Sequence, residues 1–229
     1  MSIMVSETDL IFLALNLTSV FITSILTVFL VRFYRYFHYI PLENIVLGFG
    51  ILVVSYSFGA AYQILRIFPV VPKTNLLLLI NLALQTLAFS FITVGYIFWK
   101  QEKKASRLMI LLTSLVFFVV ILAVLSALVY TSDAIPDFAA WMEYFHGVNF
   151  ALLAFVAVKS FRNYVARPDV RSSTVPGAFT LLAVSQYSLF IWSIDRGTTS
   201  LTLGAICRVI GFVLFLRVVF VQRRAAING

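Results

Sequence analysis

The stretch LIFLALNLTSVFITSILTVFLV, at residues 10–31, contains no charged side chain. A helix needs roughly 17 to 25 apolar residues to cross the ~30 Å hydrocarbon core of a bilayer, and it satisfies its own backbone hydrogen bonds there. This stretch is therefore predicted to be a transmembrane helix. Six further stretches of similar, nearly uncharged character follow along the chain, at residues 44–65, 76–99, 108–130, 138–158, 178–194 and 201–216.

The composition agrees with a protein that is embedded in a membrane. Hydrophobic residues make up 62% of the 229 positions and charged residues 11%, whereas soluble domains have roughly 45 to 50% apolar and about 25% charged residues. Seven spans and their short connections use up the chain, which leaves no room for an extramembrane domain. We therefore predict an all-α membrane protein, a seven-transmembrane-helix bundle that forms a single domain over residues 1–229.

Basic residues are distributed unevenly between the two sides of the predicted bundle. Those that follow spans 1, 3, 5 and 7 are Arg32, Arg35, Lys100, Lys103, Lys104, Arg107, Lys159, Arg162, Arg167, Arg171, Arg217, Arg223 and Arg224. After the even-numbered spans come Arg66, Lys73 and Arg196. Because Lys and Arg stay on the cytoplasmic side, the N-terminus is predicted outside and the C-terminus in the cytosol. We expect a multi-pass integral protein of the plasma or cell membrane.

The formal net charge of +8 does not indicate nucleic-acid binding, because the basic residues lie at span ends instead of forming one patch. Besides the lipid bilayer, the expected partner is a membrane or cytosolic protein that contacts the basic inner loops. The single cysteine, Cys207, excludes an intrachain disulfide.

The chain carries a faint internal repeat. Residues 32–55 align without a gap on residues 162–185 with six identities, and the segment 84–89 resembles the segment 207–212. Spans 1 to 3 would then correspond to spans 5 to 7, with span 4 as the linker of a 3+1+3 arrangement. Parallel repeats of this kind occur in transporters, where binding sites lie at the repeat interface. Chance similarity among leucine-rich helices is the alternative explanation.

Arg208 is the most informative single residue, because it is a charged side chain inside the last span. It lies about seven residues from the outer end of that span, on the order of 10 Å deep at ~1.5 Å per residue. An unpaired arginine there costs at least ~2.5 to 3.5 kcal/mol, so it should face the bundle interior. Glu143, His146 and Asn149 follow one face of span 5. Asp195 closes span 6 on the same side of the bundle.

Three interpretations of these residues stay open. In the first, Arg208, Glu143 and His146 form a polar cluster that lines an outward-facing cavity. In the second, Arg208 and an acid form a structural ion pair that locks span 7 to span 5. In the third, Arg208 contacts a partner subunit or a lipid headgroup. Other polar residues within spans either line a cavity or join helices through hydrogen bonds worth roughly 0.6 to 2 kcal/mol; they include Asn81, Gln85 and Gln186.

Signatures of catalysis and of metal binding are absent from the sequence. There is no nucleophile elbow, phosphate-binding loop or dinucleotide fingerprint. Glu143 and His146 have the Glu-x-x-His spacing of di-metal bundles, but such a site needs a second copy and two more glutamates. We therefore expect neither an enzyme nor a metal site.

Several short stretches resemble those of microbial rhodopsins, which also have seven spans and an outside N-terminus. Arg66 is followed by Thr74 and a leucine run at residues 76–79, and the segments 167–170 and 208–217 are similar to the loop before the sixth helix and to the last helix of that family. The resemblance implies the family's helical arrangement. It does not imply its retinal cofactor, because the retinal-bearing lysine would fall at or next to Arg208, and a guanidinium cannot form the Schiff base.

The sequence leaves three classes of function open, all of them non-enzymatic. The first is a sensor or transducer with a polar cluster near Arg208 that signals through a partner. The second is a small-solute transporter with parallel three-helix repeats. The third is an accessory subunit of a larger membrane complex. A water-accessible cavity that reaches Arg208 from outside favours the sensor, equivalent gates on both sides favour transport, and a solid bundle with a flat apolar face favours the subunit.

Overall fold

The apolar runs of the sequence form long helices. The computed structural model describes residues 7–37, 40–67, 75–98, 106–131, 138–166 and 174–228. Within these ranges there are seven α-helices and no strand: α1 (Glu7–Phe37), α2 (Ile40–Ile67), α3 (Asn75–Phe98), α4 (Arg107–Thr131), α5 (Phe138–Ala166), α6 (Thr174–Asp195) and α7 (Thr198–Asn228). Six of them, all but α4, are long and apolar enough to cross a membrane. The chain is thus a multi-pass helical membrane protein.

The remaining helix, α4, has 25 residues, and its apolar stretch among the described side chains is Leu108–Val124. Large hydrophobic side chains on this stretch are strongly exposed, with Leu108, Val116 and Val119 each more than 60% accessible. Such exposure is expected of a helix that faces lipid, because acyl chains are as apolar as these side chains.

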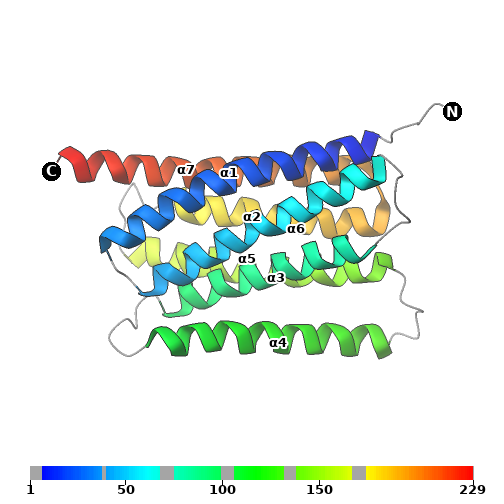
Figure 1. The fold of residues 1–229 in the computed structure, drawn as a ribbon, viewed down its shortest axis with the longest axis horizontal. Helices are drawn as coiled ribbons and strands as arrows, with labels where there is room; N and C mark the ends of the chain where they lie inside the picture. The colour runs from blue at the N-terminus through cyan, green and yellow to red at the C-terminus, as the bar shows by residue number, and fades with distance from the viewer. Residues whose placement is uncertain are drawn as a thin grey trace.

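Six helices form a closed ring, and α4 lies outside it. Around the ring the order of neighbours is α1, α2, α3, α5, α6, α7 and again α1, while α4 packs mainly against α3 (Figure 1). The axes of the helices are roughly aligned, and the chain passes back and forth between the two ends of the bundle. α1 begins at one end and α7 ends at the other (Figure 1). We call the end where α1 begins the cavity end.

Aromatic side chains fill the centre of the ring. Phe49, Tyr56, Phe179, Phe212 and Phe215, which we call the aromatic core, are all buried. Phe215 packs edge-on against Phe179 at a centroid distance of 4.7 Å and against Phe49 at 5.6 Å. Edge-to-face pairs of this kind each add about 0.5 to 1.5 kcal/mol beyond the area that they bury.

Glycine lets two pairs of helices approach closely. A Cβ atom on Gly48 of α2 would lie 2.8 Å from the carbonyl oxygen of Ala88 on α3. On the other side of the ring, a Cβ on Gly211 of α7 would lie 3.1 Å from the carbonyl oxygen of Ala178 on α6. Small residues at these positions replace side-chain contacts by backbone contacts, as is typical of helix packing in membranes.

Some residues that entered the sequence predictions lie outside the described part of the chain. They are Lys73, Thr74, Lys100, Lys103, Lys104, Arg167 and Arg171, together with the side chains of Arg107, Arg223 and Arg224. The rhodopsin-like segment 167–170 falls there as well.

Candidate functional site

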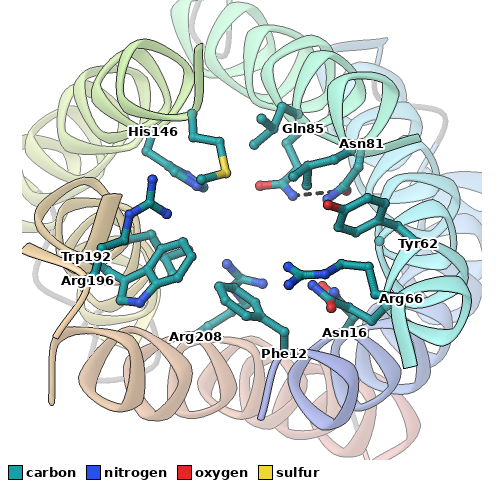
Figure 2. A pocket seen from close by; sticks show the side chains of 16 residues that line it. Phe12, Asn16, Tyr62, Arg66, Asn81, Gln85, His146, Trp192, Arg196 and Arg208 are labelled. Atoms are coloured by element: carbon teal, nitrogen blue, oxygen red, sulfur yellow. Dashed lines mark hydrogen bonds between the residues drawn. The ribbon is translucent and has the colours of Figure 1, made fainter. Parts of the chain in front are cut away.

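A cavity of about 270 Å³ opens into the ring at the cavity end (Figure 2). All six ring helices contribute to its wall, and α4 does not. The charged and other polar residues of the wall are Arg66, Arg196, Arg208, Asn16, Tyr62, Gln63, Asn81, Gln85 and His146. The apolar part of the wall consists of Phe12, Gly59, Leu78, Leu82, Met142, Leu189 and Trp192.

Arg208 lies at the bottom of this cavity. It stands ten residues into α7, which begins at Thr198, so it is about 15 Å from the start of the helix at 1.5 Å per residue. Its side chain is 3% exposed and points into the cavity (Figure 2). The guanidinium carbon lies 5.2 Å from the centroid of the Tyr56 ring on α2, a cation–π contact worth up to about 2 kcal/mol when desolvated.

The positive charge of Arg208 lacks an anionic partner within the described residues. No carboxylate oxygen of that part of the chain lies within 4.0 Å of the guanidinium, and the buried Nε atom has no hydrogen-bond partner there. A buried arginine without a counter-charge costs several kcal/mol in a membrane protein. Removing such a charge, or supplying an anion to it, lowers that cost.

Two further arginines lie at the mouth of the cavity. The side chain of Arg66 on α2 is 49% exposed, forms an ion pair of 3.3 Å with Asp9 on α1 and lies over the Tyr62 ring at 6.0 Å. Arg196 lies over the Trp192 ring at 5.1 Å. The wall therefore runs from exposed arginines at the mouth to a buried arginine at the bottom, so a solute can reach Arg208 from the cavity end.

Arg196 is placed at the mouth by the short turn between α6 and α7. It has a φ of 56°, and its N–H donates to the carbonyl oxygen of Trp192 at 2.9 Å. Asp195 accepts from the Gly197 N–H at 2.8 Å and from the Ser200 hydroxyl at 3.0 Å. Asp195, which the sequence places in the polar cluster, thus caps the first turn of α7 and is not part of the cavity wall.

Amide side chains form one side of the cavity. The Ser55 hydroxyl on α2 donates to Asn81 Oδ1 at 2.7 Å, and Gln85 Nε2 donates to the same oxygen at 3.1 Å. Gln85 Oε1 and Gln63 Oε1 are buried without a hydrogen-bond donor in the described residues, and the indole N–H of Trp192 lacks an acceptor there. Unsatisfied buried polar atoms around a cavity mark positions where water or a ligand binds.

His146, on α5, lies in the wall, and a side chain on α6 holds its ring in place. His146 Nδ1 is 2.9 Å from Gln186 Oε1 on α6, and this amide oxygen accepts a hydrogen bond from the ring N–H. Asn149, one turn further along α5, accepts a 2.8 Å hydrogen bond from the Thr86 hydroxyl on α3. Gln186 and Asn149 therefore support the site from outside the wall.

The remaining predicted member, Glu143, is half-buried and does not belong to the cavity wall. It forms no ion pair with Arg208 in the structure as described. Of the sequence-predicted residues, the cavity brings together Arg208, His146, Asn81 and Gln85. Glu143 lies one turn nearer the start of α5 than His146, and at that level of α5 it is Met142 that lines the cavity.

The sequence analysis did not single out the residues at the mouth as a group. Asn16, Arg66 and Arg196 contribute to the wall, but arginines at span ends are usually solvated and carry little signal. One signal was present. Tyr62 and Trp192 each precede an arginine by four positions, Arg66 and Arg196, which places ring and guanidinium on one face of a helix.

The wall offers charge and hydrogen bonds, and His146 is its only His, Cys, Asp or Glu side chain. Within the described ranges there is no cluster of three or more His, Cys, Asp or Glu side chains. What the arrangement can do is bind a small polar or anionic molecule between the helices. Comparison with protein-family models, with curated proteins and with solved structures finds no match for this chain.

Proposed function

We propose that this membrane protein is a sensor that binds a small ligand in the cavity and transmits the change to a separate protein. One observation supports the proposal above all others. The cavity reaches Arg208, which is 3% exposed, from one end of the bundle only, because the aromatic core lies below it. This is the geometry of a binding site that ends inside the bundle. The cavity end faces outside in this proposal, in agreement with the distribution of Lys and Arg.

Arg208 also provides a route from ligand to helix movement. Its guanidinium joins α7 to Tyr56 on α2 through the cation–π contact. A ligand that attracts the guanidinium competes with this contact and so biases the position of α7 relative to α2. Because α7 extends over 31 residues, a small rotation at the cavity end displaces its far end near Arg217. The exposed basic side chains at that end, including Arg32, Arg35 and Arg162, are the proposed contact surface for the partner.

The proposal is tested by mass spectrometry of small molecules that co-purify with the protein in a mild detergent. A Leu side chain at position 59 would project between Asn16 and Asn81, since a Cβ on Gly59 lies 3.0 Å from an amide nitrogen of each. We expect Gly59→Leu to lose the co-purifying ligand. The matched control is Gly50→Leu on the same helix, where the nearest atom to the Cβ position is 3.9 Å away, and it should retain the ligand.

If folded wild-type protein carries no small molecule, or if both leucine variants retain the same one, the sensor proposal is wrong. Size-exclusion chromatography of both variants establishes that they are folded.

A transporter is the second candidate, and the repeat supports it. The cavity lies between helices α1 to α3 on one side and α5 to α7 on the other, as expected of a site at the interface of parallel repeats. The two candidates differ in one observable. When the co-purifying ligand is enclosed in proteoliposomes, a transporter releases it at a rate that depends on the protein, whereas a sensor binds it without flux.

A further inference from the structure

The two sequence similarities within the chain correspond to fixed shifts in residue number. Residues 32–55 align with residues 162–185 at a shift of 130, with six identities, and residues 84–89 resemble residues 207–212 at a shift of 123. Applied beyond these segments, the second shift places the first residue of α3, Asn75, on the first residue of α7, Thr198. The first shift relates α1 to α5 and α2 to α6. Both shifts were taken from the sequence alone. A contact in the structure that recurs between equivalent residues is therefore separate support for the repeat.

A close backbone approach between α2 and α3 repeats between α6 and α7. The Cβ position of Gly48 approaches the carbonyl oxygen of Ala88 at 2.8 Å. Under these shifts, Gly48 is equivalent to Ala178 and Ala88 is equivalent to Gly211. These two residues approach each other in the same manner, at 3.1 Å, with the glycine on the other helix of the pair.

A second contact repeats one layer nearer the cavity. The Ser55 hydroxyl on α2 donates to the backbone oxygen of Asn81 on α3 at 2.9 Å. The equivalent residues are Ser185 and Gly204, and the backbone oxygen of Ser185 lies 3.3 Å from the Cβ position of Gly204. The Ser185 hydroxyl has no hydrogen-bond partner in the described residues. The close approach of the two residues therefore repeats at the interfaces α2–α3 and α6–α7, but the hydrogen bond does not.

The mouth of the cavity repeats as well. Under the shift of 130, Arg66 is equivalent to Arg196 and Tyr62 to Trp192. In both pairs the guanidinium lies over the aromatic ring, with its carbon 6.0 Å and 5.1 Å from the ring centroid. Figure 2 shows the two pairs on opposite sides of the cavity.

Equivalent residues also lie on opposite sides of the cavity at deeper positions. Asn16 corresponds to His146, and the two face each other across the cavity (Figure 2). Six equivalent pairs supply twelve of the 16 residues that line the cavity: Phe12 with Met142, Asn16 with His146, Gly59 with Leu189, Tyr62 with Trp192, Arg66 with Arg196 and Gln85 with Arg208. A cavity assembled in this way lies on a two-fold pseudo-axis that runs along the bundle.

One pair breaks the equivalence in charge. Gln85 on α3 and Arg208 on α7 occupy corresponding positions on opposite sides of the cavity (Figure 2). Building on the proposed ligand-binding function, we infer that the cavity consists of two equivalent half-sites, and that Arg208, standing where the other half-site has Gln85, makes it a site for one small monocarboxylate.

The charge of the wall sets the charge of the ligand. Asp9 already pairs with Arg66 at the mouth, and Arg196 is exposed there over Trp192. Arg208 is thus the single buried cation of the wall, and one carboxylate matches both its charge and its planar fork of donors. A phosphate group, with about −1.5 to −2 charges at pH 7, would leave negative charge without a buried partner.

The rest of the wall sets the size and polarity of the ligand. A volume of about 270 Å³ lies just below the roughly 300 to 1,000 Å³ of pockets for drug-sized molecules. Apolar side chains such as Leu82 and Met142 flank the space next to Arg208. The carboxylate therefore belongs to a molecule with a short apolar body.

Isothermal titration calorimetry of the full chain in lipid nanodiscs tests the charge assignment, with butanoate, butanamide and inorganic phosphate as probes. We expect butanoate to bind at least about tenfold more tightly than its neutral amide and than phosphate. Arg208→Gln should weaken butanoate about 10- to 100-fold, as expected for the loss of a charge-assisted hydrogen bond. Arg217→Gln, an exposed position on the same helix outside the cavity, should leave binding unchanged.

A charge swap tests the equivalence of the half-sites. The double variant Gln85→Arg with Arg208→Gln moves the guanidinium to the opposite wall, and it should restore butanoate binding to within about fivefold of the wild type. The single variant Gln85→Arg has a guanidinium in each half-site, and it should prefer succinate over butanoate. This second variant carries the test if the double variant does not fold.

These experiments distinguish failure of the carboxylate and half-site assignments from failure of the proposed ligand-binding function. If butanamide or phosphate binds as tightly as butanoate, the monocarboxylate assignment is wrong, but the cavity remains a ligand site. If butanoate binding depends on Arg208 and neither Gln85 variant behaves as described, the half-sites are not equivalent. If none of the probes binds, the inference is overturned, and the co-purification experiment decides separately whether the proposed sensor function falls with it.

Discussion

At the cavity end, four buried polar atoms of the wall lack a hydrogen-bond partner in the described residues, whereas deeper in the bundle the rings of the aromatic core pack against one another. Arg208 has a cation–π contact and an unsatisfied Nε, and Gln85 Oε1 lacks a donor in the described part. Only one helical turn further along α7, Phe212 is 0% exposed and packs edge-on against Tyr56 at 6.1 Å. We therefore expect the aromatic core to contribute more to stability than the wall of the cavity, where unsatisfied groups are open to a ligand.

The largest expected loss of stability concerns the aromatic core. Phe212→Ala should lower the free energy of unfolding by about 3 kcal/mol, because the truncation leaves a void among residues that are already closely packed. The measurement is equilibrium unfolding in mixed detergent micelles. Phe155→Ala, at a position on α5 that is 45% exposed, should cost under about 1 kcal/mol. Equal losses at both positions would contradict the assignment of stability to the core.

The close helix approach at Gly48 should give the next largest effect. Gly48→Ala is expected to destabilise the protein by about 2 kcal/mol, since the new Cβ would meet the Ala88 carbonyl oxygen and force the helices apart. Gly211→Ala, with a distance of 3.1 Å, should cost less. At Gly50 the new Cβ would make only an ordinary contact of 3.9 Å, with Thr27, so Gly50→Ala should change stability by no more than about 0.5 kcal/mol. The same unfolding assay ranks the three, and the reverse order would refute this account of the interfaces.

A smaller loss is expected from the cap at the rim of the cavity. Asp195→Ala removes the acceptor of the Gly197 N–H and of the Ser200 hydroxyl, and it should cost about 1 kcal/mol, as other lost caps do. Ser200→Ala removes only one of these bonds and should cost less. An unchanged unfolding midpoint for Asp195→Ala would show that the cap does not stabilise α7.

The smallest expected quantity is the coupling between Arg208 and Glu143. Because no ion pair joins them in the described residues, the effects of Arg208→Leu and Glu143→Gln should add to within about 0.5 kcal/mol. A paired arginine would behave differently, since removing one partner would strand the other charge. A double-mutant cycle with a coupling above about 1 kcal/mol would therefore restore the ion-pair interpretation.

Much of the fold follows from the sequence, because it depends on long apolar runs. The run at residues 10–31 lies within α1, and Gly48 and Gly211, which interrupt no helix, lie at close helix contacts. The position of α4 outside the ring was not predicted. Hydropathy fixes the length of a helix, but the choice of neighbours depends on side-chain shape across several helices.

The candidate site was accessible to sequence reasoning only in part. Arg208 stood out because a charge inside a span is expensive, and helical periodicity placed Asn81 and Gln85 on one face of their span. Glu143 was grouped with Arg208 because acids are scarce at that depth, yet scarcity does not show which side chains reach the cavity. Arg66 and Arg196 were missed because a basic residue at a span end looks the same in sequence whether it faces solvent or a cavity.

Ligand binding next to Arg208 can be measured directly through the fluorescence of Trp192, whose indole N–H lacks an acceptor in the described part of the cavity. The chain has three tryptophans, so Trp99→Phe with Trp141→Phe leaves Trp192 as the only one. Titration with butanoate should change its emission saturably with one site per chain, and Arg208→Gln should abolish this response over the same range. A non-saturating response, or the same saturation with Arg208→Gln, would contradict the account.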